Sequence, residues 1–176
     1  MRGARSAAFL LAQVGGHAAT RFGERLAALK LTRPHAGVLR AIAASSGLSQ
    51  QALAATLAIL PSRLVVLVDE LQERGLVERR DHPEDRRVYS LYLTAKGEQA
   101  MGEIGRVARA HNDALCGSLT HEERAQLVDL LARIADEQGL TPGVHPGFRQ
   151  LGAEARASEK AVAKRASHSG SRPRGR

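Results

Sequence analysis

Apolar residues recur along most of this chain at spacings of three and four, the pattern of helices that each bury one face. Stretches rich in Gly, Pro and Ser interrupt the pattern and divide it into six predicted helical segments. Several segments begin at a Thr or Ser, whose hydroxyl oxygen can accept hydrogen bonds from the unpaired amides of a first helical turn. The predicted N-cap residues are Thr32, Ser49, Thr94 and Thr120.

The first predicted helix covers residues 6–30. Its apolar stripe is formed by Leu11, Val14, Ala18, Phe22, Leu26 and Leu29. Gly15 and Gly16 lie in the middle of this helix, where each costs up to about 1 kcal/mol relative to Ala. We therefore expect either that the helix bends there or that another backbone approaches it closely.

The periodicity changes from helical to alternating after the fourth helix. Leu76 and Val77 open a first strand, and a charged tip at residues 82–84 joins it to a second. The second strand alternates between two sets of side chains, Tyr89, Leu91 and Leu93 on one face and Val88, Ser90 and Tyr92 on the other. Two short helices followed by a charged hairpin predict a winged helix-turn-helix, in a mainly α fold with added N- and C-terminal helices.

Three sequence motifs carry a family resemblance. They are Gly75-Leu76-Val77-Glu78-Arg79-Arg80, Asp85-Arg86-Arg87 and Leu93-Thr94-Ala95-Lys96-Gly97. In this order and spacing they resemble the wing of MarR-type transcription regulators, and the similarity covers roughly residues 31–140. The resemblance implies a DNA-binding lobe at about 31–97 and dimerisation helices at 6–30 and 95–138, within a domain of residues 1–148.

The fourth helix is the predicted DNA reader. Its buried stripe is Leu64, Leu67, Val68 and Leu71, with Val65 at the boundary, so the opposite face presents Ser62, Arg63, Val66, Asp69 and Glu70. Arg63 is the candidate for direct base readout, and Val66 can pack on a thymine methyl group. Leu60 stands at the N-cap, where it is either simply a poor cap or leaves amides free for a DNA phosphate.

The wing supplies the other predicted DNA contacts. By resemblance, Arg87 reaches into the minor groove while Asp85 orients it, and Arg86 is a second candidate. Arg79 and Arg80 are expected near phosphates. The complete predicted set is Ser49, Pro61, Ser62, Arg63, Val66, Arg79, Arg80, Asp85, Arg86 and Arg87. The alternative is a merely soluble wing with a local salt bridge, since residues 73–87 carry five basic and five acidic side chains.

Composition changes this interpretation in two respects. Aromatic residues make up only 3% of the chain, so its core must be built from aliphatic side chains, which favours helices. The net charge is +8, but residues 149–176 hold eight basic and two acidic residues, which leaves +2 for residues 1–148. The near-neutral domain must therefore contact DNA through the positions of individual basic side chains rather than through its overall charge. The basic tail is expected to be disordered and to act as a non-specific DNA tether or a solubilising segment.

The chain has no motif of an enzyme, no metal-ligand spacing and no cofactor loop, so we expect a non-enzymatic protein without cofactors. By resemblance, His17, His35 and His111 border a cleft that could take a small-molecule effector. The lone Cys116 is expected to be an inert position in the fifth helix rather than an oxidant sensor. With no apolar run of 18 residues, no membrane span is predicted, and a cytoplasmic protein is expected.

The apolar faces of the first, fifth and sixth helices exceed what one winged helix can cover, which predicts a homodimer. The expected function is therefore sequence-specific regulation of transcription, as a ligand-responsive repressor that binds double-stranded DNA at a pseudo-palindromic operator. The alternatives are a winged-helix module for protein–protein contact and a non-specific DNA-binding protein.

Overall fold

The computed structural model of the protein describes residues 6–81, 89–145 and 147–148. In this part of the chain the elements are α1 (Ala7–Ala27), α2 (Arg33–Ala44), α3 (Gln50–Leu57), α4 (Pro61–Glu73), β1 (Val77–Asp81), β2 (Tyr89–Leu93), α5 (Ala95–Leu115) and α6 (His121–Glu137). The predicted contacts Asp85, Arg86 and Arg87, and the basic tail, lie outside the described residues.

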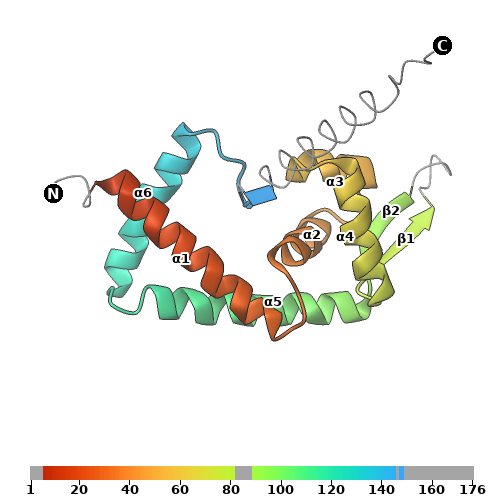
Figure 1. Ribbon diagram of the computed structural model, residues 1–176, viewed down its shortest axis with the longest axis horizontal. Helices are drawn as coiled ribbons and strands as arrows, with labels where there is room; N and C mark the ends of the chain where they lie inside the picture. The colour runs from red at the N-terminus through yellow and green to blue at the C-terminus, as the bar shows by residue number, and fades with distance from the viewer. Residues whose placement is uncertain (1–5, 82–88, 146, 149–176) are drawn as a thin grey trace, which may run out of the picture.

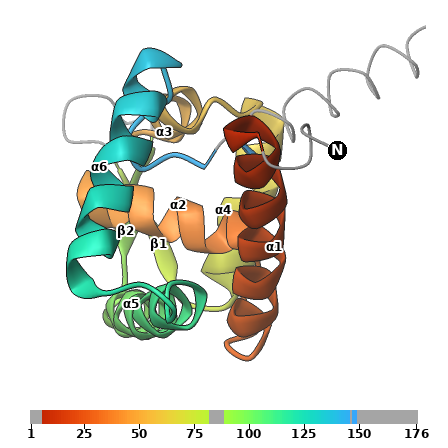
Figure 2. The same ribbon diagram turned by 90° about the vertical axis from the view of Figure 1, so that its left-hand side faces the viewer.

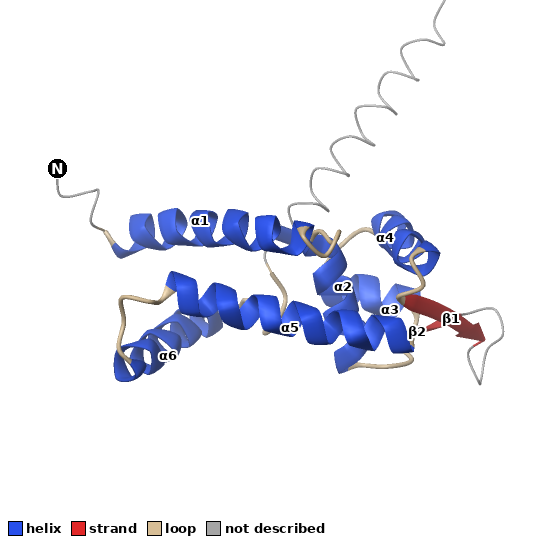
Figure 3. Ribbon diagram, turned by 90° about the horizontal axis from the view of Figure 1, so that it is seen from below, coloured by secondary structure: helices blue, strands red, loops and turns tan. Residues whose placement is uncertain are grey.

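The elements fall into two groups that the long helix α5 connects. Helices α2, α3 and α4 and the two strands gather at one end, and we call them the winged lobe (Figure 1). Helices α1 and α6 extend toward the other end, and we call them the outer helices. Viewed from below, α1 and α5 run side by side, and the β1–β2 hairpin projects beyond the end of the winged lobe (Figure 3). The mainly α, winged helix-turn-helix class predicted from the sequence is confirmed.

The helix starts follow from local capping chemistry. The hydroxyl oxygens of Thr32, Ser49, Thr94 and Thr120 each accept a hydrogen bond from a backbone amide in the first turn, as predicted. The carboxylate of Glu123 completes the capping box of α6 by accepting a bond from the Thr120 amide at 2.8 Å. Because these bonds form within four residues, the sequence alone specifies them.

The core lies in the winged lobe. The predicted stripe of α4 is fully or almost fully buried, as are Val38, Leu39 and Ile42 of α2. Its members are Leu64, Leu67, Val68 and Leu71. Leu53 and Leu57 of α3 join them, and Leu26 and Ile104 extend the same cluster to α1 and α5. An aliphatic core therefore fixes α4 against its supporting helices.

The burial of β2 differs from the expected alternation. The strands pair antiparallel, with Arg79 opposite Leu91 and Arg80 opposite Ser90. Ser90 and Leu91 are both buried although they lie on opposite faces, and Tyr89, on the same face as Leu91, is exposed. The reason lies at the outer edge of β2, where the amide of Leu91 donates to the Leu48 carbonyl at 3.0 Å and Ser49 forms a bridge to Ser90. The segment before α3 thus covers Ser90.

The outer helices bury little. No residue of α6 is buried, and no other helix or strand of the described chain makes an extensive contact with it. Exposed apolar side chains lie along both helices, namely Phe9, Leu10, Leu11 and Val14 on α1 and Leu127, Val128, Leu130, Leu131 and Ile134 on α6. Figure 2, which looks at the molecule from this side, shows α1 and α6 standing apart across the view.

Helix α1 is continuous through Gly15 and Gly16, and no described atom outside its own backbone lies within 4 Å of where a Cβ on either residue would be. The described chain therefore supplies no closely approaching backbone there. Among the described residues, no single helix has the length and hydropathy to cross a membrane, and α3 and α4 meet those limits only as a pair bent by 112°.

Candidate nucleic-acid interface

The N-terminal half of α4 presents a mixed face to solvent. Pro61, Ser62, Arg63 and Val66 are exposed, as the sequence predicted, and Val65 is exposed as well instead of lying at the boundary. The guanidinium group of Arg63 makes no hydrogen bond or ion pair with another described residue. This face therefore offers one uncommitted guanidinium group with five donors and two valine side chains, the groups that read guanine and thymine edges.

The start of α4 is the one helix start of the winged lobe without a side-chain cap. Leu60 occupies the N-cap in an extended conformation, and its side chain accepts no hydrogen bond. The amides of Arg63 and Leu64 bond to the Leu60 carbonyl at 3.0 and 3.1 Å. Because Pro61 has no backbone N–H, the Ser62 amide is the one earlier donor at this positive end of the helix dipole, and it makes no hydrogen bond with another described residue, a geometry that suits a phosphate oxygen.

Arg79 of β1 is largely committed within the protein. Its guanidinium group pairs with Asp69 of α4 at 2.5 Å and also donates to the side-chain oxygens of Gln50 and Gln72. Only 19% of its side chain is exposed. These bonds tie the wing to both helices of the helix-turn-helix, so Arg79 orients the wing whether or not it also meets a phosphate.

Arg80 is more exposed than Arg79. Its guanidinium carbon lies 4.5 Å from the centre of the Tyr92 ring, and its Nε donates to Glu78 at 2.9 Å. The stacked, planar arrangement holds the positive charge at the surface of the hairpin. Ser49, another predicted contact, is half-buried, and its hydroxyl oxygen accepts the Ala52 amide at 3.1 Å as the cap of α3.

His35 lies at a structural junction between α2 and α4. Its Nδ1 accepts the Thr32 amide at 3.3 Å, so the proton is on Nε2, which donates to the Glu70 carboxylate at 2.6 Å. The side chain is buried, and both ring nitrogens are used. An open cavity of about 560 Å³ borders this pair and is also lined by Arg33, Arg63 and Leu67.

Of the three histidines predicted to border one cleft, His17 and His111 lie near each other, whereas His35 lies apart from them beside α4. His17 is exposed on α1 and His111 packs against Phe22, with ring centres 5.4 Å apart. Burial, together with nearby Arg25, His17 and Arg21, lowers the pKa of His111 below its ordinary value. Neither His17 nor His111 lines the two cavities described here, whereas His35 lines the one beside α4.

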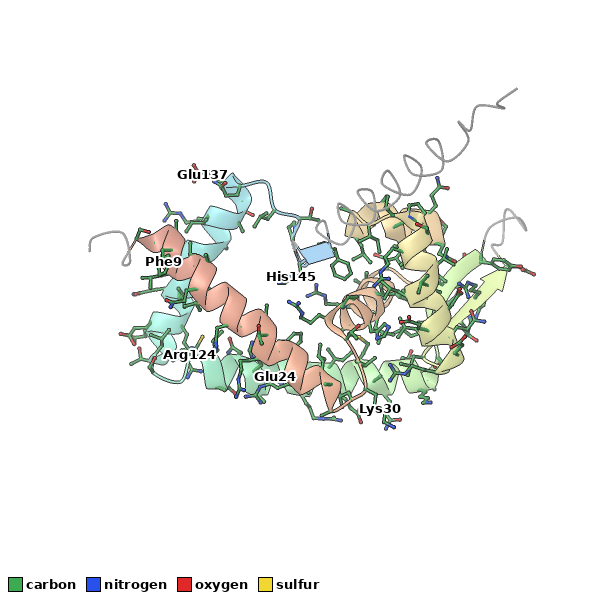
Figure 4. All side chains as sticks on the ribbon, viewed as in Figure 1. Phe9, Glu24, Lys30, Arg124, Glu137 and His145 are labelled. Carbon is green, nitrogen blue, oxygen red and sulfur yellow. The ribbon has the colours of Figure 1, made fainter. Side chains whose placement is uncertain are left out.

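A second cavity, of about 530 Å³, lies between α1, α2, α5 and the segment after α6, and we call it the interhelix cleft. Its apolar walls are Phe22, Met101, Ile104 and Phe148. Its basic residues are Arg33, Arg40 and His145, and the residues that line it include no acid. Burial and then the charges of Arg33 and Arg40 lower the pKa of His145. Figure 4 shows His145 on the segment that returns from α6 toward α2.

The cleft residues after α6 are absent from the set predicted from the sequence, because residues 140–148 are rich in the turn-forming residues Gly and Pro and show no apolar periodicity. Two signals were available. Gly37 stands within the predicted second helix, where glycine is unfavourable, and Phe148 is one of only three phenylalanines in the chain. Cys116, predicted inside the fifth helix, is the half-exposed C-cap of α5. No group of three potential metal ligands occurs in the described chain.

A buried helix-turn-helix whose second helix exposes its N-terminal half, followed by a hairpin that carries arginines, defines a winged helix-turn-helix DNA-binding protein. The sequence model of the MarR family matches residues 29–88, which include α2, α3, α4 and β1. The chain belongs to the MarR family of transcription regulators.

Curated relatives agree with this assignment. A protein named as a transcriptional regulator for the hcr operon of Thauera aromatica is 37% identical over 106 residues, which cover 60% of this chain and 64% of that protein. The transcriptional regulator HosA of Escherichia coli O111:H- is 30% identical over 59% of this chain and 77% of its own length. The match to the Thauera protein thus leaves about a third of that relative uncovered.

Solved structures share the fold. The wild-type MarR apo form from E. coli superposes with a TM-score of 0.67 at 25% identity and covers 73% of this chain and 96% of that one. The transcriptional repressor CouR, in a structure bound to a 23-mer DNA duplex, gives a TM-score of 0.66 at 32% identity, over 75% of this chain and 94% of that one.

Proposed function

We propose that the protein is a homodimeric, ligand-responsive repressor that binds a pseudo-palindromic DNA operator. In this proposal residues 31–97 form the DNA-binding lobe, and residues 6–30 and 95–138 form the dimerisation helices. The observation that carries it is the exposed N-terminal half of α4, where the Arg63 guanidinium group bonds to no other described residue. The winged lobe that holds α4 has the same fold as a repressor solved with DNA.

The case for a dimer rests on the outer helices. Five aliphatic side chains of α6 are exposed, and Val128 is 64% exposed. An apolar face of this extent is covered in most soluble oligomers by the same face of a second copy related by a two-fold axis. Two copies so related would hold their α4 helices about 34 Å apart, one turn of DNA, on an inverted repeat.

The contacts with DNA follow from the position of each side chain. Arg63 and Val66 reach base edges in the major groove, while the Ser62 amide at the uncapped start of α4 meets a phosphate. Arg80, exposed on β1, contacts the backbone of the duplex. The predicted groove contacts of Arg87, Asp85 and Arg86 belong to the same proposal, although these residues lie outside the described chain.

The interhelix cleft is the proposed effector site. Aromatic and aliphatic walls beside Arg33, Arg40 and His145 suit a small aromatic carboxylate, whose ring is buried while its charge pairs with a guanidinium group. The cleft borders α1 and α5 as well as α2, so a ligand there contacts one outer helix, the connecting helix α5 and the winged lobe. The ligand lowers operator affinity when it binds more tightly to a dimer whose two winged lobes have a different spacing from that of the DNA-binding dimer. The loss of operator binding free energy is set by the difference between the ligand's binding free energies for the two spacings.

A protein–protein contact module is the second candidate, and exposed Val65 and Val66 favour it. Selection of bound sequences from random duplexes separates the two functions. Recovery of an inverted repeat is the expected result and supports the operator-binding dimer. Recovery of unrelated sequences, with binding that disappears at moderate salt, would instead indicate non-specific contact with phosphates or a partner other than DNA.

A further inference from the structure

The interhelix cleft contains an aromatic side chain that comes from outside the winged lobe and α5. After α6 the chain turns back, with the Val144 amide bonded to the Thr141 carbonyl at 3.1 Å, and the Phe148 amide bonded to the His145 carbonyl at 3.0 Å. These turns direct Phe148 into the core cluster, where only 4% of it is exposed. Figure 1 shows this blue segment beside α2.

The ring of Phe148 fits against α2 because residue 37 has no side chain. A methyl group built on Gly37 would overlap the ring, with Cε2 only 2.5 Å away. Glycine is disfavoured in the interior of a helix, yet Gly37 lies among the buried residues of α2 with no positive φ that would require it. The close approach of Phe148 supplies the reason for a glycine at this position.

We propose that Phe148 is a specificity-determining residue of the interhelix cleft. Its ring occupies the end of the cleft beside Gly37 and so limits the size of the aromatic carboxylate that can enter. Phe148 lines the cleft together with Gly37 and Ala36, so the space it fills is continuous with the space left for a ligand. This inference rests on the proposed effector function of the same cleft and adds to it the residue that sets ligand size.

The basic residues of the cleft line the same cavity as Phe148, and one of them is also near it in the chain. His145 precedes Phe148 by three residues, and its Nδ1 accepts the Gly147 amide at 3.0 Å. The two arginines whose charges reach His145, Arg33 and Arg40, come from α2. The carboxylate of a ligand is therefore held near α2, and its ring must extend along the apolar walls toward Phe148.

The test compares two carboxylates that differ by one fused ring, benzoate and 2-naphthoate, on the full chain by isothermal titration calorimetry. Phe148→Ala should raise the ratio of the 2-naphthoate to the benzoate association constant at least about tenfold, because apolar pockets discriminate by this amount for small changes in volume. Phe148→Leu should give an intermediate ratio. Tyr89→Ala, which removes an exposed aromatic ring of the wing, should leave the ratio unchanged.

Gly37→Ala provides an independent measurement. In the wild-type background its methyl group meets the Phe148 ring, so the melting temperature should fall and the ratio should shift as in Phe148→Ala. In the Phe148→Ala background the same substitution should raise the melting temperature, because the ring is gone and alanine favours the helix. A change of sign between the two backgrounds is the expected result.

The possible outcomes separate the two levels of the proposal. Binding of benzoate to wild type with a ratio that Phe148→Ala and Phe148→Leu leave within twofold would overturn the role of Phe148 but not the effector site. Failure of both acids to bind any variant would overturn the aromatic-carboxylate site itself and this inference with it. Binding of 2-naphthoate to the Phe148→Ala variant, but not to the wild-type protein, would support both the effector site and the role of Phe148 in limiting ligand size.

Discussion

The winged lobe and the outer helices bury their apolar residues to different extents. In the winged lobe, side chains from three helices and β2 share one core, Arg79 of β1 bonds to both α3 and α4, and His35 of α2 bonds to α4. In the outer helices, α6 has no buried residue and α1 has one, Leu26, at the end that meets the lobe. The lobe is therefore complete within one chain, whereas the outer helices need further contacts to cover their apolar faces.

The largest expected effect comes from a charge on the outer helices. Leu131 lies in the stripe of α6 with Leu127 and Ile134, and Leu131→Asp would place a carboxylate in the proposed dimer interface. Light scattering should show half the mass of the wild-type protein. Operator affinity should fall about 10²–10⁴-fold, because a monomer binds one half-site of the operator whereas a dimer binds two half-sites at once.

Gln126→Asp is the matched control for Leu131→Asp, since it adds the same charge to an already exposed polar position of α6. It should preserve both the mass and the affinity. Should the Leu131→Asp protein keep the wild-type mass, the apolar stripe of α6 would not be the interface, and the difference between the two regions would need another explanation.

A smaller effect is expected on the DNA-facing side of the winged lobe. Arg63→Ala removes the uncommitted guanidinium group of α4, which should cost about 1–3 kcal/mol of operator binding and relax the preference at one base position. The free energy of unfolding should change little, because Arg63 is exposed and bonds to no other described residue. Titration of labelled operator duplexes at fixed salt measures the loss.

Arg106→Ala is the control for Arg63→Ala, because Arg106 is an exposed arginine on α5 whose pair with Glu103 is 3.7 Å long. An equal loss of affinity in both variants would mean that overall charge, rather than base readout by Arg63, determines binding. Both proteins should remain dimeric, so this pair of variants tests the winged lobe separately from the outer helices.

Features of the winged lobe could be predicted from the sequence when their causes are local. The caps at Thr32 and Thr94 depend on a partner three residues away, and the stripe of α4 depends on helical spacing alone. The buried Ser90 could not be predicted, because the segment around Leu48 covers it from more than forty positions earlier. The same holds for the Arg79–Gln50 and His35–Glu70 bonds, which join residues 29 and 35 positions apart.

The candidate site was predicted in outline for a similar reason. Exposed positions on α4, such as Ser62 and Arg63, follow from the buried stripe on its other side. The cleft residues His145 and Phe148 lie after a turn-rich stretch whose path the local pattern does not determine. The contact between Phe148 and Gly37 spans more than a hundred residues, so a lone glycine in a helix was the available sign of it.

The smallest expected effect lies where an outer helix meets α5, at the contact between Phe22 and His111. Burial and nearby positive charges lower the pKa of His111 in the folded protein, so the unfolded state binds a proton near pH 6.5 that the folded state does not yet bind. The free energy of unfolding should therefore fall as the pH drops below about 6.5, until the lower pKa of the folded state is reached.

His111→Phe removes this titration and keeps a ring against Phe22, so urea unfolding at pH 7 and pH 5 should give a smaller difference for the variant than for wild type. The His145 imidazole, whose pKa is also lowered, keeps part of the slope in both proteins. A pH dependence that His111→Phe does not reduce would show that groups other than His111, among them His145 in the interhelix cleft, produce the slope. The contact between α1 and α5 would then contribute no measurable dependence on pH, although it joins the complete lobe to the incomplete outer helices.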